Sequence, residues 1–83
     1  MYLSVKEVKP LDGYKLLLTF ENGEERIFDM KPYLEKGIFK ELKDKSLFNS
    51  VKISYDSIVW ENEADMDPEM LYEDSVPYGI IKQ

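Results

Sequence analysis

The chain contains neither cysteine nor histidine. Without cysteine it cannot form a disulfide, a thiolate nucleophile or a zinc–thiolate site. Without histidine it lacks the side chain most often used for proton transfer near neutral pH. Apolar runs such as Leu16–Leu18 are far shorter than the roughly 20 residues that span a bilayer. We therefore name no catalytic residue, expect no enzyme, and expect no membrane-spanning helix.

Glycine is scarce as well, with four residues scattered along the chain at expected turns. The sequence has no glycine-rich loop of the kind that holds phosphates, so we expect no nucleotide cofactor. It also lacks the basic segment followed by an apolar run that marks a signal peptide. We expect a cytoplasmic protein that does not associate with membranes.

The residues that are present have the composition of one small globular domain covering residues 1–83. Hydrophobic residues make up 43% of the chain, which is too many for a disordered segment. A domain of this size buries only roughly 60% of its unfolded surface, so its stability is marginal. Any large apolar side chain left outside the core therefore calls for a second explanation.

The clearest local signal is Asn22-Gly23, which lies between two apolar-rich segments. Asn-Gly is favoured at the centre of a two-residue type I′ turn because both residues adopt positive φ. Such a turn predicts a hairpin in which Leu18 faces Ile27. A further strand is predicted before the hairpin, over residues 2–9.

That first strand is expected to contain a bulge, because Val5 and Val8 lie out of phase for a flat strand. After the hairpin, residues 30–34 predict one helical turn with Asp29 as its N-cap. A short helix follows, and three apolar residues mark its buried face: Ile38, Phe39 and Leu42.

The second half of the chain predicts another hairpin, formed by strands over residues 51–55 and 58–60 with a turn at Asp56-Ser57. Asp67 and Pro68 then have the residue types of an N-cap and a first helical position, so a C-terminal helix is expected to end near Ser75. The predicted order is β-β-β-α-β-β-α, an α+β fold with a three-stranded antiparallel meander.

The apolar pattern also predicts which side chains form the core. Its expected members are Leu16, Leu18, Phe20, Ile27, Phe39, Leu42, Ile53 and Trp60. Leu17 and Phe28 are expected to pair on the opposite face of the first hairpin. We expect the C-terminal helix to cover this pair, and the alternative is a homodimer contact through the same two residues.

An ordered set of residues resembles a known family. The set is Phe20-x-x-Gly23, Ile27-x-Asp29, Ile38-Phe39-x-x-Leu42, Phe48, Val51, Trp60 and Ala64-Asp65-x-Asp67-Pro68-x-x-Leu71-Tyr72. It resembles the small bacterial family called domain of unknown function 2442, over residues 3–75, and leaves residues 76–83 as a tail. The chain departs from the pattern at Glu63, where the family often has glycine, so the turn after Trp60 is expected to differ.

The resemblance implies a β-meander, a helix and a second hairpin. It brings no established activity and no catalytic residues. It also implies that members are often encoded beside a second small domain, in an arrangement suggestive of toxin and antitoxin pairs.

Charge is distributed unevenly along the chain. Residues 1–52 hold ten Lys or Arg and nine Asp or Glu, whereas residues 53–81 hold eight Asp or Glu and no basic residue. A negative field of this kind repels nucleic acid and anionic membranes and favours basic partners. The alternative is a solvated acidic surface that only keeps the protein soluble.

Two different sites follow from these observations. The first is a binding surface for a small basic protein, in the manner of an antitoxin, with six acidic residues as candidates: Glu61, Glu63, Asp65, Glu69, Glu73 and Asp74. The second is a ligand- or substrate-handling site built from Trp60, Tyr72 and Asp65.

A calcium loop beginning at Asp65 is not expected. Such a loop needs glycine at its sixth position and glutamate at its twelfth, where this chain has Met70 and Val76. We therefore assign no metal ligand.

Overall fold

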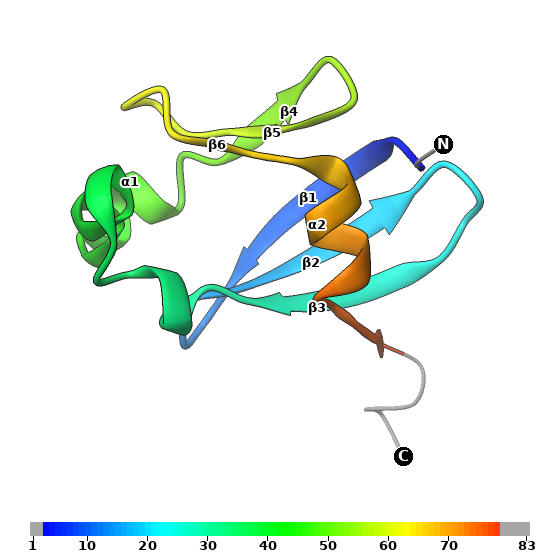
Figure 1. Ribbon diagram of the computed structural model, residues 1–83, viewed down its shortest axis with the longest axis horizontal. Coiled ribbons are helices and arrows are strands. Elements are labelled where there is room, and N and C mark those ends of the chain that lie inside the picture. Colours follow the sequence, from blue (N-terminus) through cyan, green and yellow to red (C-terminus); the bar gives the residue numbers. More distant parts are fainter. Residues whose placement is uncertain (1–2, 79–83) are drawn as a thin grey trace.

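The computed structural model describes residues 3–78, and most of this part of the chain folds into two antiparallel sheets (Figure 1). The larger sheet has the order β1-β2-β3-β7, formed by Val5–Leu11, Lys15–Phe20, Glu25–Asp29 and Val76–Pro77. The smaller sheet has the order β4-β5-β6, formed by Lys52–Ser54, Ser57–Val59 and Asp65–Met66. These strands and a few short helices confirm the predicted α+β class.

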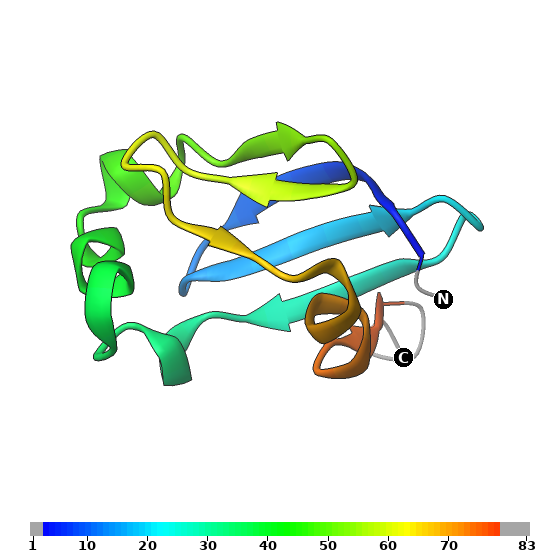
Figure 2. The same cartoon turned by 45° about the horizontal axis from the view of Figure 1, so that its top comes forward.

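The helical elements within residues 3–77 are all short. Two are 3-10 helices, η1 (Lys31–Tyr33) and η2 (Gly37–Lys43), and two are α-helices, α1 (Lys45–Phe48) and α2 (Pro68–Glu73). Figure 2 shows the smaller sheet lying over the larger one, with η2 and α1 closing one end and α2 at the other. The core therefore fills the space between the two sheets.

The buried apolar cluster joins both sheets and the helices. It consists of Val5, Leu16, Leu18, Phe20, Phe28, Met30, Leu34, Leu42, Phe48, Val51, Ile58, Trp60, Ala64, Met66 and Leu71. Phe39 and Ile53 pack against this cluster and are only partly buried. The predicted core is therefore confirmed in its centre, and Ile27, which is half-buried and outside the cluster, was wrongly assigned.

The turn of the first hairpin explains this error. The Phe20 amide donates to the Glu24 carbonyl at 2.9 Å, the Gly23 amide donates to the Phe20 carbonyl at 2.8 Å, and Gly23 has φ 90°. Asn22 does not have positive φ. The connection is a three-residue loop closed by a glycine in the left-handed region, and the expected two-residue turn is wrong.

One extra loop residue shifts the register of the whole hairpin. Leu18 faces Arg26, Leu17 faces Ile27 and Leu16 faces Phe28. Because side chains alternate across a strand, a shift by one residue exchanges the two faces of β3.

The predicted pair of Leu17 and Phe28 is consequently wrong. Phe28 is 1% exposed and its ring stacks on that of Tyr33, whereas Leu17 lies on the other face of the sheet. Helix α2 packs on the inner face, where the Tyr72 ring contacts the Phe20 ring edge-on at 5.1 Å.

Strand β1 contains the predicted bulge, between Val5 and Glu7. It continues beyond the expected end at Lys9 and passes through Pro10 to Leu11. Proline is tolerated there because β1 is the first strand in the order of its sheet, so one side of its backbone lies outside the ladder.

The second hairpin turns one residue earlier than expected. Ser54 faces Ser57 across the ladder, so the turn is Tyr55-Asp56, and Ser57 is already in β5. The Ser57 hydroxyl is buried and donates to the Met66 carbonyl, which joins β5 to β6. Tyr55 is fully exposed with φ 57°.

Helices α2 and η1 were predicted well from the aspartate side chain that precedes each of them. Asp67 Oδ1 accepts from the Glu69 amide at 2.9 Å, and α2 ends at Glu73, as expected. Asp29 Oδ1 accepts from the Lys31 amide ahead of η1, although the cap position itself is Met30.

The segment after η1 was predicted less well. It forms a 3-10 helix in which Ile38 is 44% exposed, so Ile38 does not belong to a buried helix face. Helix α1, capped by Asp44, was not predicted at all.

Candidate functional site

The segment from the β5–β6 turn through β6 to α2 runs along one side of the molecule (Figure 2). We call its six exposed acidic residues the acidic ridge: Glu61, Glu63, Asp65, Glu69, Glu73 and Asp74. Asp74 accepts a hydrogen bond from the Tyr33 hydroxyl at 3.3 Å. Within residues 3–78, the other five side chains form neither a hydrogen bond nor an ion pair. The ridge thus presents carboxylates that no basic group of the described chain neutralises.

Glu63 occupies an unfavourable backbone conformation within this ridge. The Trp60 amide donates to the Ala64 carbonyl and the Glu63 amide to the Trp60 carbonyl, both at 2.9 Å. This is the same pattern as in the first hairpin, and Glu63, with φ 72°, stands where that hairpin has Gly23. The turn after Trp60 thus has the backbone geometry of the first hairpin without a glycine.

We predict that Glu63→Gly stabilises the protein. A side chain in the left-handed region costs about 1 kcal/mol, which glycine avoids. The exposed Glu63 side chain forms no hydrogen bond or ion pair within residues 3–78 that would be lost. Urea unfolding should give a higher midpoint for Glu63→Gly, and a lower one for Gly23→Glu, which places the same strain in the first hairpin. A lower midpoint for Glu63→Gly would show that the glutamate itself stabilises the turn.

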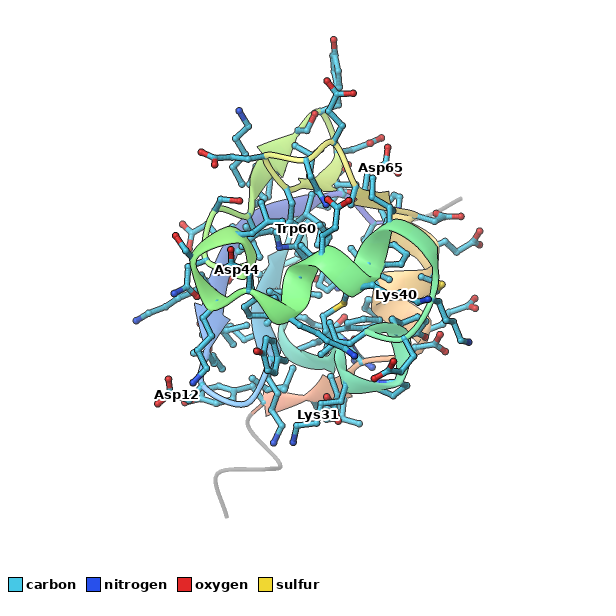
Figure 3. All side chains as sticks on the ribbon, turned by 90° about the vertical axis from the view of Figure 1, so that its left-hand side faces the viewer. Asp12, Lys31, Lys40, Asp44, Trp60 and Asp65 are labelled. Carbon is cyan, nitrogen blue, oxygen red and sulfur yellow. The ribbon has the colours of Figure 1, made fainter. Side chains whose placement is uncertain are left out.

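The residues of the second predicted site do not share one open surface, because Trp60 is buried and Asp65 is exposed. Trp60 is 1% exposed, and its indole N–H donates to the Phe48 carbonyl at 3.0 Å. Figure 3 shows Trp60 near the middle of the molecule and Asp65 towards its outer edge. Tyr72 lies on α2, and its hydroxyl donates to Glu24 Oε1 at 2.6 Å. Trp60 is a core residue, as expected from its strand alternation.

Sequence reasoning missed a polar network centred on Arg26. Its guanidinium donates to the Ser75 hydroxyl at 2.7 Å, to the Ser75 carbonyl at 2.8 Å and to Glu24 Oε2 at 3.2 Å. The guanidinium carbon also lies 4.3 Å from the centre of the Tyr72 ring. Arg26 thereby joins β3 to the end of α2 and to the start of β7. The Arg26 guanidinium, the Glu24 carboxylate and the hydroxyls of Tyr72 and Ser75 all form hydrogen bonds with one another. The network therefore stabilises the packing of α2 and β7 against β3.

The same network perturbs two titratable groups. The hydrogen bond from Tyr72 lowers the pKa of Glu24 below its usual 4.5, and Asn22 and Arg26 act in the same direction. The same bond raises the pKa of Tyr72 above its usual 10.0. By linkage, the Glu24 contribution to stability is present above pH 4.5 and is lost as the pH falls through its lowered pKa. The Tyr72 contribution is present below pH 10.0 and is lost as the pH rises through its raised pKa.

We therefore predict a plateau in the effect of Tyr72→Phe. The difference in unfolding free energy between the wild type and Tyr72→Phe should be constant between about pH 5 and pH 9. It should shrink at more acidic and at more alkaline pH. Chemical denaturation across this range measures it, and a difference that does not change at either end would contradict the proposed bond to Glu24.

A hollow of about 590 Å³ lies beside β1 and β4 and is also lined by residues of β2 and β3. Four apolar side chains line it: Val8, Leu17, Val51 and Ile53. Its polar lining includes the three lysines Lys6, Lys9 and Lys52. The sequence could not reveal this hollow, because it forms only where the bulged start of β1 lies beside β4.

The described residues include neither a metal-binding cluster nor a membrane-spanning helix. Over residues 3–78, no cluster of acidic side chains has the geometry to hold a metal ion. In the same range, none of the helices has the length and apolar character needed to cross a membrane.

The two antiparallel sheets and the short helices define a small α+β domain. Residues 5–77 match the family model described as protein of unknown function (DUF2442). The chain belongs to this family, as the ordered residues around Trp60 and Asp67 indicated. Neither the curated proteins nor the solved structures include a match to the chain.

Proposed function

We propose that the chain is a non-enzymatic, cytoplasmic protein-binding module whose acidic ridge holds a small basic protein. The observation that carries the proposal is the set of six exposed carboxylates, five of which form neither a hydrogen bond nor an ion pair within residues 3–78. The gene arrangement implied for members of the family favours a toxin as the partner, with this chain as the antitoxin.

Glu63 adds a second argument. A strained conformation that a glycine would relieve persists where the side chain itself is useful. Glu63 lies in an exposed turn of the ridge, and its side chain forms no hydrogen bond or ion pair within residues 3–78. A charge held at a conformational cost supports a binding role over a surface that only maintains solubility.

The arrangement of the ridge suits a basic partner of moderate size. Glu69 and Glu73 are four residues apart on α2, so their side chains share one face of the helix. Glu61 and Glu63 lie at the other end of the ridge, beyond β6. Charges spread over such a length act together on an approaching cation-rich surface.

The test compares two charge-matched variants in a pull-down from the native host. One carries Glu61→Gln, Glu63→Gln and Glu73→Gln. The control carries three exposed substitutions outside the ridge: Glu7→Gln, Glu21→Gln and Glu25→Gln. We expect the wild type and the control to retain one small basic protein that the ridge variant loses. Equal retention by all three proteins would contradict the proposal.

A further inference from the structure

The hollow between β1 and β4 has the size of a binding pocket. Its volume of about 590 Å³ lies within the range of roughly 300–1,000 Å³ that is usual for ligand sites. The apolar residues Leu17, Val51 and Ile53 form part of its lining. Leu17 and Ile53 are only partly buried, so they leave apolar surface open to a bound chain.

The lysines give the hollow a charge opposite to that of the whole protein. Lys6 and Lys9 lie on β1 and Lys52 on β4, and none of the three forms an ion pair within residues 3–78. The chain as a whole carries a formal net charge of −6. Unpaired lysines beside an apolar floor, in an acidic protein, are the complement of a carboxylate-bearing segment.

We propose that this hollow binds an extended acidic peptide segment of another protein, with apolar side chains over Leu17 and Ile53 and carboxylates against Lys6, Lys9 and Lys52. An extended segment fits because both walls of the hollow are strands. Side chains of an extended segment alternate in direction, so apolar and acidic residues in alternation match the two kinds of lining.

The acidic residues of the hollow favour a peptide over nucleic acid. Glu7 and Glu25 also line it, and in the sheet both lie in one row with Thr19. A phosphate backbone would have to pass these carboxylates, which repel it. A peptide can place a neutral or apolar side chain there and keep its carboxylates for the lysines.

Tyr55 does not line the hollow, but its turn is hydrogen-bonded to the start of β1. It lies at the tip of the β4–β5 hairpin, and the carbonyl of the neighbouring Asp56 accepts from the Val5 amide at 3.0 Å, directly before Lys6. Figure 1 shows this tip close to the start of β1. A fully exposed aromatic residue with φ 57° contributes nothing to the core, and tyrosine is among the residues that anchor interfaces.

The experiment measures binding of a labelled peptide in which glutamate and valine alternate. A control peptide carries lysine in place of each glutamate. Fluorescence anisotropy is recorded with the wild type and with the variant Lys6→Gln, Lys9→Gln, Lys52→Gln. The charge-matched control variant is Lys31→Gln, Lys40→Gln, Lys45→Gln, whose lysines are exposed on η1, η2 and α1.

We expect the glutamate peptide to bind the wild type and the control variant with similar affinity. It should bind the hollow variant, Lys6→Gln, Lys9→Gln, Lys52→Gln, roughly tenfold more weakly. Tyr55→Gly should weaken binding without lowering the melting temperature, because glycine suits its backbone angle. The ridge variant Glu61→Gln, Glu63→Gln, Glu73→Gln should bind the peptide at least as well as the wild type, which separates this site from the proposed function.

Three results would overturn the proposal. The first is an equal loss of affinity in the hollow variant and the control variant. The second is tighter binding of the lysine peptide than of the glutamate peptide, and the third is no binding of the glutamate peptide to the wild type. In each case the hollow would be a surface feature without a ligand of this chemistry.

Discussion

Replacing Trp60 by alanine is expected to cost about 3–5 kcal/mol of folding stability. The side chain is 1% exposed and contacts the rings of Phe39 and Phe48. Its removal leaves a large cavity between the two sheets and also frees the Phe48 carbonyl from the indole N–H. Domains of this kind have only about 5–15 kcal/mol in total, so much of the variant should be unfolded near physiological temperature.

Tyr55→Ala is the matched control, since Tyr55 is a large aromatic residue at the turn between β4 and β5 and is fully exposed. Thermal unfolding followed by circular dichroism should show a large fall in melting temperature for Trp60→Ala and almost none for Tyr55→Ala. Similar melting temperatures for Trp60→Ala and the wild type would mean that Trp60 is at the surface and available for a ligand.

The second large effect is expected at Arg26, where Arg26→Met should cost about 2–3 kcal/mol. The arginine side chain is 12% exposed, and the substitution removes both of its bonds to Ser75 and its stacking on Tyr72. Hydrogen bonds to a charged group contribute about 1.5–3 kcal/mol each, and part of this is recovered by the apolar packing of methionine.

Lys15→Met provides the control, because Lys15 is an exposed cation in the same sheet. Urea unfolding should give a free energy of unfolding for Arg26→Met that is lower than that of Lys15→Met by most of the expected cost. Hydrogen exchange adds a local measurement: the amides of α2 and β7 should lose protection in Arg26→Met before those of β1 and β2. Uniform loss of protection would show that Arg26 does not hold the C-terminal segment specifically.

Short-range chemistry was predictable from the sequence. The cap at Asp67 and the start of α2 at Pro68 were correct because both depend on residues adjacent in the chain. The position of the first turn was also correct, and its register was wrong. A glycine at positive φ serves both a two-residue and a three-residue connection, and nothing in Asn22-Gly23 distinguishes them.

Two elements were too short for any periodic signal. Strands β6 and β7 contain two residues each, and alternation cannot be detected over that length. They are strands because of long-range backbone pairing, in which Met66 pairs with Ile58 and Val76 pairs with Ile27.

Among the candidate sites, too, those formed by residues close together in the chain were predictable and those formed by distant residues were not. The acidic ridge was predictable because its charges lie close together in the chain, between Glu61 and Asp74. The structure adds that all six are exposed and that, within residues 3–78, only Asp74 forms a hydrogen bond. The Arg26 network joins residues 49 positions apart, and the hollow joins β1 to β4. Neither leaves a local pattern in the sequence.

The central claim, that the acidic ridge recruits a basic partner, is tested most directly by association kinetics. The partner retained in the pull-down is mixed with the wild type and with Glu61→Gln, Glu63→Gln, Glu73→Gln by stopped flow at low and at physiological salt. Exposed charges are screened over about 8–10 Å and act mainly on the association rate. We predict that the wild-type rate falls markedly as salt rises, and that the variant associates slowly at both salt concentrations while its melting temperature stays close to that of the wild type. An association rate that depends on neither salt nor the substitutions would contradict the account and leave the ridge as solvated surface.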